Sequence, residues 1–281
     1  HNLSLTGGGE KASYRLGLGY LSQLGQTKGT GLDRLSTTLN LDYIVSEKIK
    51  FIADFSYTRS QQEANYLDPG TEAYKKMPNM SIYEWQQNDN GDWVQTPNFF
   101  IPQTIAGTTQ WNTTSLSGSF NPVAMAELGV SDVVEERLRP QFRLQYRIAR
   151  WLSYEGTAAF DVNNRKDSRF LPQETVGGSF TGFVNISQNV EREQVGVSTY
   201  NKLVFTPNLG DIHSLTTLVQ YEVNESKSRQ TEVNSANSAT SMLRDPAIPS
   251  RIRNSALETI SNESKSRRAA ALVQATYSLL D

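Results

Sequence analysis

The sequence contains no cysteine, only two histidines and no long apolar run. Without cysteine, the protein has neither disulfide bonds nor thiolate metal sites. His1 and His213 do not form a convincing pair of catalytic nucleophile and base with any neighbouring motif, so the sequence does not predict an enzyme. No stretch approaches the roughly 18 consecutive apolar residues of a membrane-spanning helix.

The charge is nearly balanced, with 27 Lys and Arg against 29 Asp and Glu. This balance leaves no basic surface for nucleic acid, and no nucleic-acid partner is expected. The mean hydropathy of -0.50 is compatible with a membrane barrel, because a barrel strand of about 9 to 11 residues needs an apolar residue only at every second position. The chain opens at His1 without a signal peptide, so we expect an excised or processed piece.

Apolar and polar residues alternate with a period of two in several stretches, which predicts strands with two unlike faces. The clearest stretches are 12–21, 34–43, 49–58, 139–148 and 152–162, and weaker ones lie near 194–206, 213–224 and 267–280. With a short segment at 2–6, the sequence predicts about nine strands.

The connections between these strands are alternately short and long. The short ones are 7–11, 45–48, 149–151 and 207–212, and the long ones are 22–33, 59–136, 163–193 and 225–266. Loops beyond about 15 residues are uncommon in compact domains, so four of them in rotation favour a barrel with long loops at one rim. The sequence therefore predicts an all-β fold: a segment of an antiparallel up-and-down transmembrane β-barrel, with apolar side chains toward lipid and polar ones toward a lumen.

Strand register offers a check on this fold. If Tyr43 pairs with Ile49, Asp42 lies opposite Lys50 on the polar face. Leu3 and Leu5 are at odd positions, whereas the apolar residues of the following stretch, 12–21, are at even positions. A bulge is therefore expected in 7–9 to bring both sets to one face.

The short hairpin near residue 150 makes a second demand on the register. Ile148 and Leu152 share the apolar face only if 149–151 form the loop or a bulge takes up the offset. That register places Arg139 across from Asp161, and Gln145 across from Glu155.

Three groups of side chains are candidate functional residues. The long loop 59–136 is rich in aromatic residues, which could contact a substrate or simply pack the loop. Polar-face charges could line a path or pair with charges on neighbouring strands, and aromatic residues at strand ends are typical of interfacial girdles. The candidates are Tyr83, Trp85, Trp93 and Trp111 for substrate contact; Asp42, Lys50, Arg139, Arg143, Arg147, Glu155 and Asp161 for the lumen; and Tyr20, Tyr43, Tyr57 and Trp151 for the girdles.

No cofactor or metal is expected. The segment 89–92 has part of a calcium loop but lacks the remaining ligands, and a plain turn is the simpler interpretation. Glu155 and Asp161 share a strand face, but six residues along a strand separate them by roughly 20 Å, too far for a glycosidase pair.

Several phrases of the sequence resemble a known family. They are His1-Asn2-Leu3-Ser4-Leu5-Thr6-Gly7-Gly8, Tyr14-Arg15, Gly19-Tyr20-Leu21, Lys28-Gly29-Thr30-Gly31, Leu39-Asn40-Leu41-Asp42-Tyr43 and Phe55-Ser56-Tyr57-Thr58. They resemble the early barrel of SusC/RagA-type TonB-dependent transporters. Asn90-Gly91-Asp92-Trp93 and Asn121-Pro122-Val123-Ala124 match the loop pattern of that family more loosely.

This resemblance implies an active importer in the outer membrane of Bacteroidetes-like bacteria. Family members use a plugged barrel of the 22-stranded class, work with a SusD-like surface lipoprotein and draw energy through TonB. Their substrates are commonly oligosaccharides and sometimes peptides. We therefore expect residues 1–281 to be part of one barrel domain, with a long external loop at about 59–136 and without the plug.

Two other functions remain open at this point. One is a passive porin or structural outer-membrane barrel, which would need no energy coupling. The other is a soluble surface adhesin, in which the apolar faces would meet inside a β-sandwich.

Overall fold

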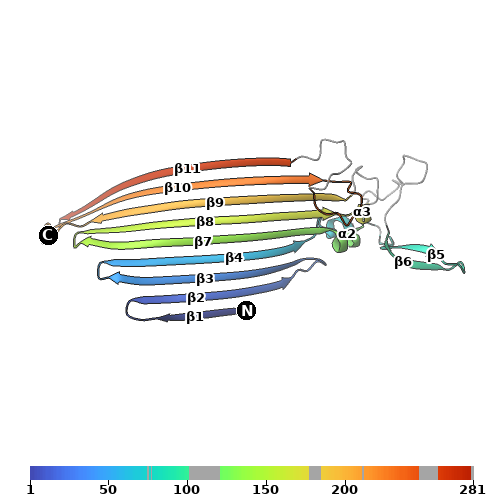
Figure 1. Cartoon of the computed structure of the whole chain (residues 1–281), viewed down its shortest axis with the longest axis horizontal. Coiled ribbons are helices and arrows are strands. Elements are labelled where there is room, and N and C mark those ends of the chain that lie inside the picture. Colours follow the sequence, from blue (N-terminus) through green and yellow to red (C-terminus); the bar gives the residue numbers. More distant parts are fainter. Residues whose placement is uncertain are drawn as a thin grey trace.

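The computed structural model describes residues 1–74, 76, 78–100, 121–176, 185–210, 212–246 and 259–279. In this part of the chain, nine strands form one antiparallel sheet in the order β1-β2-β3-β4-β7-β8-β9-β10-β11. Figure 1 shows tight turns at one end of the sheet, and helices and a separate hairpin at the other. We call these the short-turn end and the long-loop end. The predicted all-β, up-and-down arrangement is confirmed.

The strands of the main sheet are β1 (Asn2–Gly8), β2 (Ala12–Leu24), β3 (Gly31–Ser46), β4 (Ile49–Ala64), β7 (Val130–Ala149), β8 (Leu152–Leu171), β9 (Ile186–Phe205), β10 (His213–Ser235) and β11 (Thr259–Leu279). The separate hairpin consists of β5 (Tyr83–Gln87) and β6 (Trp93–Phe99). The helices are α1 (Pro69–Tyr74), α2 (Pro122–Leu128) and α3 (Gln173–Val176). No helix in the described ranges is long and apolar enough to cross a membrane.

The main sheet is a single layer with one apolar and one polar face. On the apolar face, Phe55, Phe142 and Leu144 remain 38%, 42% and 39% exposed, so no second sheet covers them. The buried apolar cluster consists instead of Met125 and Leu171 at the long-loop end. A β-sandwich would bury these strand residues in its centre, so the structure argues against the adhesin.

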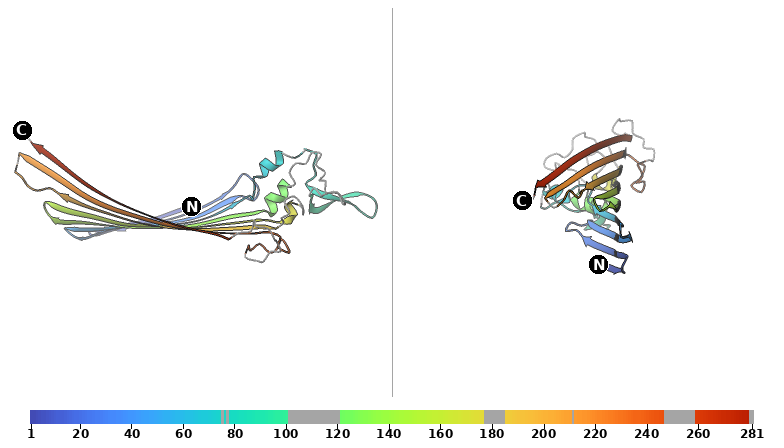
Figure 2. Two further views of the ribbon diagram at one scale, coloured as in Figure 1. Left: turned by 90° about the horizontal axis from the view of Figure 1, so that it is seen from above. Right: turned by 90° about the vertical axis from the view of Figure 1, so that its left-hand side faces the viewer.

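The polar face is hollowed. One hollow is lined by residues of six strands, from Arg15 on β2 through Asn40, Asp54 and Arg139 to Ser198 on β9. Seen from the short-turn end, the sheet forms an open arc (Figure 2). The polar side chains therefore line the inside of a curved wall.

The apolar face carries a band of nearly constant height. On β7 the outward residues are apolar from Leu138 to Ile148, and on β8 most are apolar from Leu152 to Val162. The corresponding segments are 35–43 on β3, 49–57 on β4, 195–205 on β9, 215–223 on β10 and 269–279 on β11. Each matches the about 9 to 11 residues that a tilted strand needs to cross the hydrocarbon core.

Beyond this band the strands continue, which corrects the predicted loop lengths. The connections run over 25–30, 65–129, 172–185 and 236–258, instead of 22–33, 59–136, 163–193 and 225–266. Above the band both faces of the sheet are polar. The period-two signal therefore disappears from the sequence although the backbone ladder continues.

The register near residue 150 is confirmed. Gln145 pairs with Glu155, a bulge between Arg147 and Ala149 takes up the offset, and Arg139 Nε lies 3.4 Å from Asp161 Oδ2. Because of the bulge, Ile148 and Leu152 both stay on the predicted apolar face.

The register between β3 and β4 differs in detail. Tyr43 pairs with Phe51 rather than Ile49, because a bulge between Ile44 and Ser46 shifts the ladder. The shift keeps each side chain on its predicted face. Lys50 still donates to Asp42, at 2.9 Å, as a diagonal neighbour.

The bulge expected in 7–9 is wrong. Leu3 pairs with Leu18 and Leu5 with Leu16, in an unbroken register. The backbone N–H of Gly9 donates to Ala12 at 2.8 Å, closing a turn around two residues. A two-residue loop pairs odd with even positions, so both leucines reach the apolar face without an irregularity.

The two faces of β3 predict opposite responses to an introduced charge. Leu39→Arg places a cation against hydrocarbon and should cost about 2 to 4 kcal/mol of unfolding free energy. Asn40→Arg should cost far less, because residue 40 lies on the polar face beside Asp54, its present hydrogen-bond partner. Both variants are compared by denaturant unfolding of the protein in lipid bilayers. Equal losses would contradict the assignment of the faces.

Candidate functional site: a charged polar wall and an aromatic hairpin

Toward the short-turn end, the polar face of the sheet carries ion pairs between neighbouring strands. Lys50 lies 2.9 Å from Asp42, and Lys202 lies 3.5 Å from Glu155. Alternate residues of adjacent strands share a face, which brings these side chains together. Three residues predicted to line the lumen, Asp42, Lys50 and Glu155, are therefore on the polar face, and each has a charged partner on a neighbouring strand.

Asp161 is the centre of a tighter arrangement. Arg137 binds its two carboxylate oxygens through Nε at 2.9 Å and Nη2 at 2.6 Å, while Arg139 approaches at 3.4 Å. The geometry is bidentate, the stronger form of an arginine–carboxylate contact. Sequence reasoning named Arg139 and missed Arg137, although Arg137 continues the same alternation by one step.

Arg143 and Arg147 are different. Both project from the polar face of β7, but neither has an ion pair with another described residue. The Nε of Arg143 is shielded from solvent and has no hydrogen-bond partner among the described side chains and backbone. These two arginines leave positive charge available on the wall, near the short-turn end.

A second charged cluster lies above the band, on β7, β8 and β9. Asp167 is 7% exposed and accepts from Arg165 Nε at 3.1 Å and from Arg192 Nη1 at 3.3 Å. Glu135 lies 4.0 Å from Arg165. Sequence reasoning missed this cluster because it assigned residues 163–193 to a loop. A signal was nevertheless present in the sequence. Asp161, Arg165 and Asp167 are all at odd positions of β8, so they continue the same period-two alternation on the polar face.

Polar pairing continues onto β10. Glu232 accepts hydrogen bonds from Gln188 and Asn234, each at 2.9 Å. The bond from Asn234, followed by that from Gln188, lowers the pKa of Glu232 below its ordinary value. This carboxyl therefore stays charged under conditions in which an exposed glutamate begins to take up a proton.

The hairpin of β5 and β6 carries two exposed tryptophans on one face. Trp85 pairs with Gln95 and Trp93 with Gln87, so the two rings are diagonal neighbours. They are 51% and 65% exposed, and Trp85 Nε1 donates to Ser81 Oγ at 3.0 Å. Figure 1 shows this hairpin projecting beyond the long-loop end of the sheet.

The other aromatic candidates have different surroundings. The ring of Tyr83 stacks on Phe99, with centroids 5.2 Å apart and an interplanar angle of 22°, so it packs the base of the hairpin. Trp111 lies outside the described residues.

The turn of this hairpin is held by its own backbone. The side-chain oxygen of Asn88 accepts from the N–H groups of Asn90 and Asp92, at 3.0 Å and 2.9 Å. Gly91 has a φ of 85°, a left-handed conformation suited to glycine. No group of three or more acidic or histidine side chains able to hold a metal occurs among the described residues.

The girdle candidates lie on the apolar face or at its edges. Tyr20 is 48% exposed near the long-loop end of β2, and its hydroxyl donates to Asp33 at 3.1 Å. Tyr57 closes the band on β4, and Tyr43 lies at the short-turn end of β3. Trp151, in a short turn, packs edge-on against Phe205. These positions suit rings that prefer a boundary between apolar and wet surroundings.

Comparison with known proteins gives relatives of one kind. "TonB-dependent receptor P39" of Formosa agariphila is 25% identical over 229 residues, which are 79% of this chain and 19% of that protein. "TonB-dependent receptor P26" of the same organism is 24% identical over 217 residues, covering 77% of this chain and 20% of that protein. The chain thus spans about a fifth of the length of these relatives. No family model matches the sequence.

Solved structures share the fold. The RagAB peptide importer in its closed-closed state has a TM-score of 0.69 at 16% identity, over 99% of this chain and 30% of that one. The unliganded ferric citrate transporter FecA has a TM-score of 0.54 at 9% identity, over 99% of this chain and 32% of that one. The single-layer sheet, its apolar band and the similarity in fold agree that the chain is part of the wall of an outer-membrane β-barrel, and in sequence it is similar to TonB-dependent receptors.

Proposed function

We propose that this wall segment belongs to an active importer that takes up oligosaccharides or peptides through the outer membrane, with energy supplied through TonB. The observation that carries the proposal is the unbroken polar face. It extends from the Lys202–Glu155 pair near the short turns, through Asp161, to the Asp167 cluster above the band. The similarity to TonB-dependent receptors in sequence and to the RagAB peptide importer in fold supports the proposal.

The wall is polar but internally paired, which suits a path for large polar solutes. Many charges on it are neutralised by a neighbour, so a passing sugar or peptide meets hydrogen-bonding groups as well as charge. Arg143 and Arg147 are among the polar-face charges that have no ion pair with another described residue. We assign them to contact with carboxylates of a plug inside a closed barrel of the 22-stranded class, of which residues 1–281 would be one part.

Trp85 and Trp93 are the proposed first contacts for substrate. Two flat rings on one face of a projecting hairpin can stack on sugar rings or on apolar side chains of a peptide. A SusD-like lipoprotein is the proposed partner at this end, because the long connections and the hairpin gather there. Tyr83 supports the hairpin through Phe99, which favours loop packing over substrate contact for that residue.

Energy coupling separates this proposal from a passive porin. Cells that carry the whole receptor are given fluorescently labelled oligosaccharides and peptides, with and without the tonB gene. We expect accumulation in the periplasm to require TonB and to stop when a protonophore collapses the proton gradient. Equal accumulation in both strains would favour the porin.

Loss of the two tryptophans should weaken substrate capture. Each ring is worth about 1 kcal/mol of stacking, so Trp85→Ala combined with Trp93→Ala should raise the Kd by about tenfold or more. Val94→Ala is the matched control, because Val94 lies on the opposite face of the same hairpin and is similarly exposed, at 48%. Binding is measured by calorimetry with the substrate identified by the uptake assay. An unchanged Kd in the double variant would remove these rings from the site.

A further inference from the structure

On the apolar face, charged side chains begin directly above the lipid-facing band. After Val223 the outward residues of β10 are Glu225, Lys227 and Arg229, and after Ala269 those of β11 are Arg267, Lys265 and Glu263. These six residues, together with Glu136, Lys166, Glu191 and Glu193 of the neighbouring strands, form what we call the outer collar. The collar faces away from the lumen, so the transport path does not account for it.

The centre of the collar is a pair of like charges. Lys227 lies directly across from Lys265 in the ladder, an arrangement that is unfavourable without an anion nearby. Two carboxylates flank the pair, with Lys227 Nζ 3.1 Å from Glu263 and Lys265 Nζ 2.7 Å from Glu225. Arg267 also reaches Glu225, at 2.6 Å.

The two cations hold the pKa of Glu225 below its ordinary value, through hydrogen bonds from Lys265 first and then Arg267. Yet the three cationic side chains of this group stay 53% to 70% exposed. Exposed ion pairs of this kind are weak. A stronger anion could therefore replace the carboxylates as their partner.

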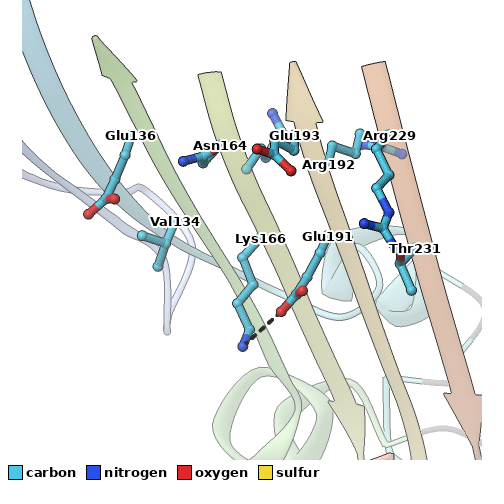
Figure 3. Close-up of a pocket in the computed structure, with 10 residues that line it drawn as sticks. Val134, Glu136, Asn164, Lys166, Glu191, Arg192, Glu193, Arg229 and Thr231 are labelled. Atoms are coloured by element: carbon cyan, nitrogen blue, oxygen red, sulfur yellow. Dashed lines mark ion pairs between the residues drawn. The ribbon is translucent and has the colours of Figure 1, made fainter. Parts of the chain in front are cut away.

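A hollow extends the collar from β10 across β9 and β8 to β7. It has a volume of about 730 Å³ and its lining includes Glu136, Asn164, Lys166, Glu193 and Arg229. Figure 3 shows Lys166 and Glu191 joined by an ion pair, with Arg229 standing on the adjacent strand. Arg229 has no ion pair with any residue in the described ranges. Its guanidinium is thus available at the edge of the hollow.

The position of the collar indicates what it meets. The outward residues one step below it are the apolar Val223, Val195 and Ala269 of the lipid-facing band. A molecule seated on the collar is therefore at the depth of lipid headgroups, and its hydrocarbon part can continue onto the band. Lysine and arginine are suited to phosphate, while Asn164 and the glutamates can bind hydroxyl groups.

We propose that the outer collar binds the phosphate-bearing sugar headgroup of a glycolipid in the outer leaflet. The phosphate would lie between Lys227 and Lys265 with Arg229 beside it, and the sugar would occupy the hollow. The continuity of the collar with the lipid-facing band favours a lipid over free phosphate, because only a lipid contacts both surfaces.

The test uses the full-length receptor in detergent, with native mass spectrometry as the readout. Diphosphoryl lipid A is the probe, and its dephosphorylated form is the comparison. We expect the phosphorylated form to bind more tightly, and the triple variant Lys227→Gln, Arg229→Gln, Lys265→Gln to bind it about tenfold or more weakly.

A matched pair of variants controls for total charge. Arg229→Gln and Arg268→Gln remove the same charge from neighbouring strands, but Arg229 lies on the outer face beside the proposed phosphate and Arg268 lies on the polar face. Only Arg229→Gln should weaken lipid binding. Equal effects of the two, equal binding of both lipid forms, or full displacement by inorganic phosphate would overturn the proposal. The proposal would also be overturned if the triple variant bound the lipid normally but no longer bound a partner protein, because the collar would then be a protein-binding surface.

Discussion

The structure depends on one constraint: a sheet with hydrocarbon on one side must satisfy its backbone hydrogen bonds within the sheet. Each strand of the main sheet therefore pairs along much of its length with the strand that follows it in that sheet. This pairing fixes the alternation of side chains, so that one face becomes apolar and the other polar. The ion pairs of the lumen wall and the tyrosines at the band edges all follow from their place in this ladder.

Three environments act on the same strands. Within the band the two faces differ sharply, as Leu144 and Arg143 do on β7. Above it both faces carry charge, with the Asp167 cluster inside and Lys166 with Glu191 outside. The helices and the aromatic hairpin lie at the end of this charged zone, where Asn121 caps α2 by accepting from the backbone N–H groups of Val123 and Ala124.

The sequence was sufficient for the fold where hydrophobicity alternates. It predicted the faces of 139–148 and 152–162, the opposition of Gln145 and Glu155, and the contact of Arg139 with Asp161. It was insufficient above the band, where Arg165 and Asp167 stand on strands that carry no hydrophobic signal. Turn geometry was a further source of error. A two-residue loop pairs odd with even positions, so Leu3 lies opposite Leu18 on the apolar face without any bulge. Trp85 and Trp93 were named because the long loop is rich in aromatic residues, but only strand pairing places them on one face.

The extension of the strands beyond the lipid band has a mechanical consequence. From Val162, at the edge of the band, to Leu171, β8 rises about 30 Å along its own direction at about 3.3 Å per residue, or about 20 Å in height at a tilt near 45°. If the proposed lipoprotein partner is anchored by an acyl chain, it must bridge that height before it can cover the mouth of the barrel. Its tether then needs at least about six extended residues between the lipidated end and the folded domain, so tether length sets whether such a partner can close the mouth.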